Sequence, residues 1–324
     1  MEGNKLLELK DIVIEYRTDE AIIHAVNGVN LVVNEGETLG IVGETGAGKT
    51  TIARSILRIL QTPPAKFVSG EIIFEGEDLM KKSESEMRKI RGGKIAMIFQ
   101  DPMTALNPIE KVGFQIAEAI GLHEDISRIE AERRASLMLE MVGIPMERYN
   151  EYPHQFSGGM KQRVVIAIAL ACNPLLLLAD EPTTALDVTI QAQVLEMMEE
   201  LKTKLNTSVV MITHDLGIVA HTCNSVAVIY AGEIVEYGTV EHIFDEKMHP
   251  YTIGLFGSLP KIDSTVRRLQ PIKGLMPDPT TLPPGCRFAE RCPDATDRCS
   301  VEAPETIEVT PGHLVKCYLA EVNK

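Results

Sequence analysis

Apolar residues change their spacing several times along the chain, and each change marks a different predicted element. Alternating or short continuous apolar runs predict strands, whereas spacings of three and four residues predict helices. Two alternating runs and then a continuous one precede the glycine-rich stretch at residues 43–51. The predicted strands are Leu6–Glu15, Val26–Val33, Thr38–Val42, Gly70–Phe74, Ile95–Phe99, Leu175–Ala179, Ser208–Thr213, Val226–Tyr230 and Glu233–Tyr237.

Helical spacing begins directly after the glycine-rich stretch, in Ile52–Leu60. From Pro108 to about Tyr152 the pattern is that of amphipathic helices, which predicts a helical insertion. Helices and strands then alternate up to residue 213, and this alternation is typical of an α/β fold with a parallel sheet. We therefore predict an α/β core with a small antiparallel β-subdomain and a helical subdomain at about residues 108–172.

The length of 324 residues corresponds to about two domains, and the composition changes near residue 245. Residues 260–324 contain four of the six cysteines, many prolines and few long apolar runs. We therefore expect one domain at residues 1–245 and a small, Cys-rich C-terminal extension at residues 246–324.

The net charge of −14 argues against a nucleic-acid partner, because phosphate backbones are bound by concentrated Lys and Arg. Met1–Lys5 shows no signal-peptide pattern. The apolar stretch Val164–Ala179 contains a proline and is shorter than the roughly 20 residues of a membrane span. A soluble, cytoplasmic protein is the expectation.

The glycine-rich stretch has the spacing G-x-x-x-x-G-K-[ST] between a predicted strand and a predicted helix. Its glycines let backbone N–H groups face phosphate oxygens, and the helix N-terminus adds its positive end. Lys49 is expected to contact the outer phosphates and Thr50 to hold Mg²⁺ through its hydroxyl group. A chance glycine-rich turn is the alternative. The predicted nucleotide-binding residues here are Gly43, Glu44, Thr45, Gly46, Ala47, Gly48, Lys49, Thr50 and Thr51.

Two adjacent carboxylates follow the apolar run Leu175–Ala179, which reads as a strand buried on both faces of a parallel sheet. Open α/β sheets bind ligands at the carboxyl ends of their strands. Asp180 is therefore a candidate ligand of Mg²⁺, and Glu181 is a candidate for polarising the attacking water.

Ser157-Gly158-Gly159 opens another predicted helix and is a second candidate anion site. One triphosphate needs only one wrapped loop, so two such sites favour a two-fold arrangement in which each subunit covers the nucleotide of its partner. The chain here resembles the ABC-type ATPases, whose signature motif contains Ser-Gly-Gly. The resemblance covers about residues 5–245 and implies the P-loop ABC cassette fold and ATP hydrolysis.

The resemblance implies roles for residues that follow in the family's order. Tyr16 matches the aromatic residue that stacks on adenine, and Gln100 matches the Q-loop glutamine that senses Mg²⁺ and the attacking water. His214 matches the switch histidine at the γ-phosphate, and Ala185-Leu186-Asp187 matches the D-loop between subunits. Taken alone, Tyr16 and His214 are more often structural residues. The expected catalytic residues are Lys49, Gln100, Glu181 and His214, and the expected Mg²⁺ residues are Thr50, Gln100 and Asp180.

Two residues depart from the family's common signature, which has Leu and Gln where this chain has Phe156 and Met160. Both flank the phosphate-contacting residues, so altered packing and retained binding are expected. A single cassette without a membrane span implies separate membrane subunits. Asp101–Pro108 resembles the segment of peptide-importer ATPases that contacts those subunits, and a plain proline-bounded loop is the alternative.

Four cysteines of the C-terminal region follow the pattern C-x5-C-x6-C-x17-C; they are Cys286, Cys292, Cys299 and Cys317. In a cytoplasmic protein this favours metal binding over disulfides, and four thiolates suit zinc or an iron–sulfur cluster. The absence of close C-x2-C pairs favours the cluster. Cys172 and Cys223 are expected to be packing residues.

The segments His249–Thr252 and Leu282–Phe288 resemble the C-terminal extension of oligopeptide and dipeptide importer ATPases. This resemblance covers about residues 246–320. It implies a structural or regulatory [4Fe-4S] cluster on the four cysteines, with zinc or four free buried thiols as alternatives.

The two resemblances together imply the ATP-hydrolysing subunit of an ABC transporter that imports dipeptides or oligopeptides. It would lie peripherally at the cytoplasmic face of the cell membrane. The implied partners are a second homologous ABC ATPase, two transmembrane permease subunits and, indirectly, an extracytoplasmic peptide-binding protein, with no nucleic acid. A homodimer is the alternative to the ATPase heterodimer. The alternative functions are nickel import, a soluble ABC ATPase without a transport role, and a P-loop kinase.

Overall fold

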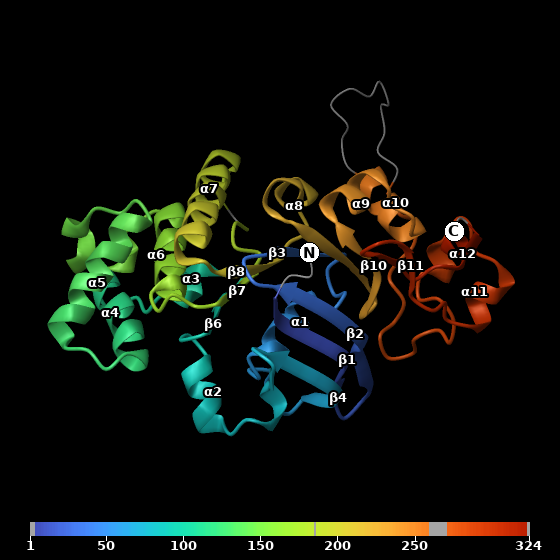
Figure 1. The fold of residues 1–324 in the computed structure, drawn as a ribbon, viewed down its shortest axis with the longest axis horizontal. Coiled ribbons are helices and arrows are strands. Elements are labelled where there is room, and N and C mark those ends of the chain that lie inside the picture. The colour runs from blue at the N-terminus through green and yellow to red at the C-terminus, as the bar shows by residue number, and fades with distance from the viewer. Residues whose placement is uncertain (1–3, 185, 259–270, 323–324) are drawn as a thin grey trace. The chain divides into compact units, whose positions relative to one another are not determined.

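The computed structural model describes residues 4–184, 186–258 and 271–322 (Figure 1). Its residues form two compact units, and each is described by itself. The first unit comprises Met1–Lys5, Val33–Thr38 and Lys81–Ile212, and the second comprises Leu6–Val32, Leu39–Met80 and Thr213–Lys324.

The parallel core of the first unit consists of three strands and the helices α6 and α7, with bounds β6 (Ile95–Ile98), β7 (Leu176–Asp180), β8 (Ser208–Ile212), α6 (Gly158–Leu170) and α7 (Val188–Leu205). β7 pairs in parallel with β6 on one side and with β8 on the other, with Asp180 opposite Ile212. Every residue of β7 and β8 is buried, which explains why both strands appear in the sequence as continuous apolar runs. The predicted parallel core is thereby confirmed.

The segment from Pro108 to Tyr152 is helical, as its periodicity predicted, and consists of α4 (Val112–His123), α5 (Arg128–Met141) and the 3-10 helix η2 (Met146–Asn150). α4 and α5 lie side by side (Figure 1). Ser127 begins α5 because its hydroxyl group accepts a hydrogen bond from the Glu130 N–H. The short helices before and after this segment are η1 (Leu79–Lys81), α2 (Glu84–Ile90), α3 (Pro102–Ala105) and η3 (Pro153–Gln155).

The stretch Val164–Ala179 divides into the end of α6, a connecting turn and β7, as its proline predicted. None of the helices within the described ranges combines the length and apolar character that a membrane span requires.

The second unit begins with an antiparallel sheet in the order β2-β1-β4-β5, with bounds β1 (Lys5–Arg17), β2 (Ile22–Asn34), β4 (Ala65–Phe74) and β5 (Glu77–Asp78). β1 runs antiparallel to β4, with Leu7 opposite Phe74. β1 and β2 are both longer than predicted: β1 continues to Arg17, and β2 already begins at Ile22, four residues before the predicted Val26. The expected antiparallel β-subdomain is present.

A second sheet of this unit contains the strand that precedes the glycine-rich stretch, in the order β11-β12-β10-β9-β3. The strands are β3 (Thr38–Val42), β9 (Ser225–Tyr230), β10 (Glu233–Thr239), β11 (Ile307–Thr310) and β12 (His313–Val315). β9 and β10 form the predicted hairpin at Ala231-Gly232, both of which have positive φ angles. β12 pairs antiparallel with β10, so the C-terminal region extends this sheet.

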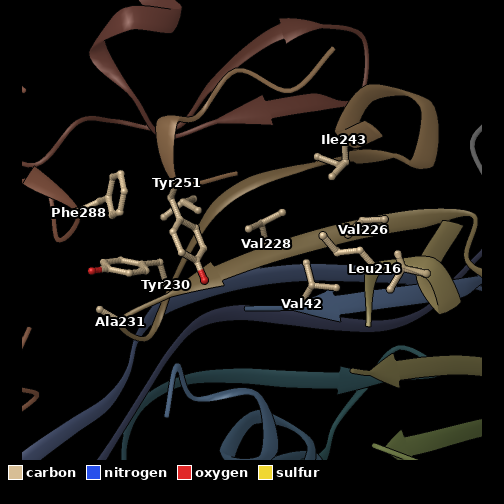
Figure 2. Close-up of a cluster of buried hydrophobic side chains, with 11 residues drawn as sticks. Val42, Leu216, Val226, Val228, Tyr230, Ala231, Ile243, Tyr251 and Phe288 are labelled. Carbon is tan, nitrogen blue, oxygen red and sulfur yellow. The ribbon is translucent and has the colours of Figure 1, made fainter. Parts of the chain in front are cut away.

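The C-terminal region also shares a hydrophobic core with β3 and β9 (Figure 2). Tyr230, Tyr251 and Phe288 are all buried, with ring centroids 4.6–5.4 Å apart, and Val42 belongs to the same cluster. The remaining helices of this unit are α1 (Lys49–Ile56), α8 (Leu216–Thr222), α9 (Val240–Asp245), α10 (Pro250–Gly257), η4 (Ala289–Arg291), α11 (Asp297–Val301) and α12 (Tyr318–Val322).

Gly113 in α4 provides a test of the helical packing. A β-carbon at this position would overlap with the Tyr149 ring of η2. We expect Gly113→Ala to lower the free energy of unfolding by about 1–3 kcal/mol, because the ring or the helix must shift. The measurement is urea unfolding followed by circular dichroism.

Gly121→Ala is the matched control, since Gly121 lies in the same helix and a β-carbon there would meet no atom within 4 Å. Because alanine has a higher helix propensity than glycine, Gly121→Ala should raise the free energy of unfolding by roughly 0.5–1 kcal/mol. Equal effects of the two substitutions would show that the Gly113–Tyr149 contact is unimportant.

Candidate functional site

The glycine-rich loop connects β3, whose five residues are all buried, to α1. A β-carbon at Gly43 would overlap with the carbonyl oxygen of Ile229. Gly48 has φ 103°, and a β-carbon there would lie 2.5 Å from the carbonyl oxygen of Ala25. Only glycine fits both positions, because the loop backbone approaches neighbouring strands too closely for a side chain.

Lys49 is the first residue of α1, and its side chain turns back onto the loop. Its Nζ donates hydrogen bonds to the carbonyl oxygens of Gly43 at 2.7 Å and Glu44 at 2.9 Å. The residue is only 7% exposed. The ammonium group is therefore held at the concave side of the loop, where a phosphate group would be bound.

Two further predicted residues of this unit have defined surroundings. The hydroxyl groups of Tyr16 and Thr51 are hydrogen-bonded at 3.0 Å, which connects β1 with α1. His214 is exposed and precedes Asp215, whose carboxylate caps α8. The expected contacts of Tyr16 with adenine and of His214 with the γ-phosphate stay predictions.

In the first unit, Asp180 ends β7 with 1% exposure and Glu181 follows it directly. Glu181 has φ 49°, and its N–H donates to the Ile212 carbonyl at 2.8 Å. Gln100 Nε2 and Thr184 Oγ1 both donate to Glu181 Oε2, at 3.0 and 2.9 Å. The two donors fix the direction of the Glu181 carboxylate.

Ser157 caps α6, because its Oγ accepts a hydrogen bond from the Met160 N–H at 3.4 Å. A β-carbon at Gly158 would meet no atom within 4 Å, so the start of the helix is open to an anion. Gln162, buried in the same helix, donates to the carbonyl oxygen of Pro182. This hydrogen bond connects the signature helix to the residue after the candidate catalytic carboxylate.

Arg148 contacts both of the unusual signature residues, Phe156 and Met160. Its guanidinium carbon lies 4.4 Å from the centroid of the Phe156 ring, and its Nη1 lies 3.2 Å from Met160 Sδ. These contacts give the two residues a packing of their own beside Ser157, as expected from the sequence.

The predicted site residues are divided between the two units. Gln100, Ser157, Gly158, Gly159, Asp180 and Glu181 lie in the first unit, and Tyr16, Gly43–Thr51 and His214 lie in the second. In the D-loop, Asp187 caps α7, whereas Ala185 lies outside the described residues. Within the first unit the structure places Gln100 against Glu181, and within the second it places Lys49 against the loop that precedes it.

Residues 26–184 match the family model of the ABC transporter, and residues 235–299 match that of the oligopeptide/dipeptide transporter C-terminal region. The oligopeptide transport ATP-binding protein OppD of Bacillus subtilis (strain 168) is 52% identical over 97% of this chain and 89% of its own length. This chain belongs to the oligopeptide/dipeptide family of ABC transporter ATP-binding proteins.

Other members and solved cassettes agree with this assignment. The dipeptide transport ATP-binding protein DppD of Bacillus subtilis (strain 168) is 48% identical over 98% of this chain and 95% of its own length. The cassette MJ0796, solved as a dimer bound to ADP and Pi, is 30% identical, with a TM-score of 0.65 over 72% of this chain and 99% of that chain. The expected ABC cassette fold and ATPase activity are confirmed, and ATP with Mg²⁺ is the substrate of such an enzyme.

The expected [4Fe-4S] cluster and its zinc alternative are wrong. Among the described residues, no group of three or more His, Cys, Asp or Glu side chains is placed to hold a metal ion. None of the six cysteines, all of which lie within the described residues, forms a disulfide, and the four of the C-terminal region line a largely apolar cavity of about 30 Å³. Burial raises the pKa of Cys286 and Cys317, and it raises that of Cys292 to about 11.

Sequence reasoning missed three residues that support the site. Gln162 is the one with a local signal, since it is a polar residue among the mostly apolar buried positions of α6. Tyr251 and Arg291 contact the glycine-rich loop from the C-terminal region, more than 200 residues away along the chain. No local sequence pattern predicts contacts between residues so far apart in the chain.

Gly48→Ala tests whether the glycine loop is required for binding. The β-carbon would meet the Ala25 carbonyl and strain a positive φ, so we expect ATP affinity to fall at least tenfold and stability to fall by roughly 1–3 kcal/mol. Isothermal titration with Mg-ATP and thermal unfolding provide the two readouts.

Gly76→Ala is the matched control, because Gly76 also has positive φ but a β-carbon there would meet no atom within 4 Å. It should lower stability by about 1 kcal/mol without weakening ATP binding. A Gly48→Ala variant that binds Mg-ATP as tightly as the unmutated chain would contradict the assignment of the loop.

Proposed function

We propose that this ATPase drives the import of dipeptides or oligopeptides through separate membrane permease subunits. The observation that carries the proposal is the pairing of an ATPase site with a C-terminal region of the oligopeptide/dipeptide type in one chain. The relatives described above are named for oligopeptide and dipeptide transport, which supports peptides and gives no support to nickel.

Within the site, each predicted residue has a proposed task. Lys49, held against the loop carbonyls, contacts the outer phosphates of ATP, and His214 contacts the γ-phosphate. Glu181 polarises the attacking water, and Gln100 holds the Glu181 carboxylate in position, as their 3.0 Å hydrogen bond suggests. Tyr16 stacks on adenine.

The residues proposed to hold Mg²⁺ are Thr50, Gln100 and Asp180. A hydroxyl, an amide oxygen and a buried carboxylate form the all-oxygen donor set that this ion prefers. When bound, Mg²⁺ neutralises charge on the phosphate groups during transfer.

Each cassette completes the site of a second one in this proposal. Ser157, Gly158 and Gly159 form the open N-terminus of α6 and would bind the nucleotide of the partner cassette. We propose a heterodimer with a homologous ATPase, two permease subunits and, indirectly, an extracytoplasmic peptide-binding protein, with the chain at the cytoplasmic face of the membrane. The cassette would occupy residues 1–245, with its helical subdomain at about residues 108–172, and the C-terminal extension would occupy residues 246–324.

The helical segment offers a surface for the permease subunits. A cleft of about 560 Å³ is lined by Phe114, Ile129 and Tyr149, together with charged residues. Ile129, which lines this cleft, is 79% exposed. Exposed apolar residues around a cleft are typical of a protein–protein contact, and this one follows the Asp101–Pro108 segment in the chain.

Glu181→Gln tests the proposed catalysis and its coupling to transport. The amide keeps the shape of the side chain but cannot take up a proton, so ATP turnover should fall about 10²–10⁴-fold while Mg-ATP binding is kept. In vesicles that contain the assembled transporter, uptake of a labelled tripeptide should fall with it.

Glu199→Gln is the matched control, because Glu199 lies on the exposed face of α7. This substitution should leave ATP turnover and tripeptide uptake unchanged. Normal turnover in Glu181→Gln would refute the role of Glu181. Turnover without peptide uptake in the unmutated transporter would refute peptide as the substrate.

A further inference from the structure

The phosphate loop carries a carboxylate that is held by the C-terminal region. Arg291 Nη1 lies 2.8 Å from Glu44 Oε2, and Arg291 Nη2 lies 3.0 Å from Glu44 Oε1, which is a bidentate ion pair. The Arg291 side chain is 6% exposed and that of Glu44 is 29% exposed. A planar guanidinium group in this geometry fixes both the position and the charge of the carboxylate.

Arg291 is itself fixed by three other groups. Its Nε donates to the Lys273 carbonyl at 3.0 Å, and its Nη1 donates to the Tyr230 hydroxyl at 3.2 Å. Its guanidinium carbon lies within 6 Å of the Tyr230 and Phe288 rings, which are buried in the core of Figure 2. Burial by itself lowers the pKa of Arg291, but the hydrogen bonds to Glu44 and Tyr230 raise it above its ordinary value, so the group stays charged.

The backbone of Glu44 connects this ion pair to the candidate phosphate-binding lysine. The Glu44 N–H donates to the Tyr251 hydroxyl at 2.9 Å. The Glu44 carbonyl accepts hydrogen bonds from Lys49 Nζ at 2.9 Å and from the Ala47 N–H at 3.2 Å. One residue thus joins the C-terminal region to the ammonium group of Lys49.

The segment that includes Met276 and Pro279, which precedes Arg291 in the chain, also lies next to the glycine-rich loop and β2. A β-carbon at Gly46 would lie 3.3 Å from Met276 Cε, so this methionine lies next to the loop. The His24 N–H donates to the Pro279 carbonyl at 2.9 Å, at the start of β2. The C-terminal region therefore contacts the loop through Arg291, Tyr251 and Met276.

We propose that Arg291 and Tyr251 are positioning residues for ATP binding, and that they act through Glu44. Arg291 neutralises a carboxylate that would otherwise repel the phosphate groups, and Tyr251 holds the Glu44 peptide whose carbonyl directs Lys49. This inference rests on the proposed phosphate site at Gly43–Thr51. Since binding energies are reciprocal, ATP also stabilises this arrangement of the C-terminal region.

A double-mutant cycle on the full chain tests the charge interaction. The variants are R291M, E44Q and the double variant, and the measurement is the Kd of the magnesium complex of β,γ-imido-ATP by isothermal titration. R291M should weaken binding about fivefold or more in the unmutated background, because it leaves the Glu44 charge uncompensated. In the E44Q background the same substitution should weaken binding less than about twofold, because no charge remains to be compensated.

R287M is the matched control for general loosening of the C-terminal region. Arg287 lies four residues before Arg291 and pairs with Glu233 at 3.3 Å, on β10. R287M should leave the Kd within about twofold of the unmutated value, as expected when no charge beside the loop changes. The conservative variant R291K should weaken binding less than R291M does, because it keeps the charge and loses only the bidentate geometry.

Two further readouts keep the inference testable if R291M folds poorly. Y251F removes the acceptor of the Glu44 N–H and should raise the KM for ATP with little change in kcat. The inference would be overturned if R291M raised the Kd equally in the unmutated and E44Q backgrounds. It would also be overturned if R287M raised the Kd as much as R291M does. If the unmutated chain binds the nucleotide and the cycle shows no coupling, this inference alone fails; if the unmutated chain binds none, the proposed phosphate site fails first.

Discussion

The conformation of the phosphate loop is determined by two backbone–backbone contacts that leave no room for a side chain. Gly43 lies against the Ile229 carbonyl of β9, and Gly48 lies against the Ala25 carbonyl of β2. These contacts fix both ends of the loop between β3 and α1, so that Lys49 begins the helix and turns toward the loop carbonyls. Phosphate binding by the second unit depends on this constraint, because the closely packed loop backbone sets the position of the Lys49 ammonium group.

The parts that the sequence predicted well are those decided by neighbouring residues. Four leucines in succession predicted a strand buried on both faces, and Asp180 and Glu181 duly stand at its carboxyl end. The helix after the loop was predicted at Ile52–Leu60, whereas α1 spans Lys49–Ile56, so both of its ends differ from the prediction. Local patterns report burial and turn geometry, so they predict which elements are present better than where each element begins and ends.

The parts that the sequence could not predict are those decided by distant contacts. The spacing of the four C-terminal cysteines says nothing about where their side chains point, and they line a small cavity without forming a metal site. The pairing of Arg291 with Glu44 joins residues 247 positions apart, and neither residue stands out in its own segment. Composition predicted a C-terminal extension but gave no sign that its strand β12 would join the sheet that contains β3.

Hydrogen exchange measured with and without Mg-ATP tests the central claim most directly, namely that the loop held by the C-terminal region is the triphosphate site. Peptides that cover Gly43–Thr51 should exchange more slowly when Mg-ATP is bound, because their N–H groups then bond to phosphate oxygens. Peptides that cover Ala289–Arg291 should be protected with them. Binding of Mg-ATP with no change in exchange at Gly43–Thr51 would contradict the account.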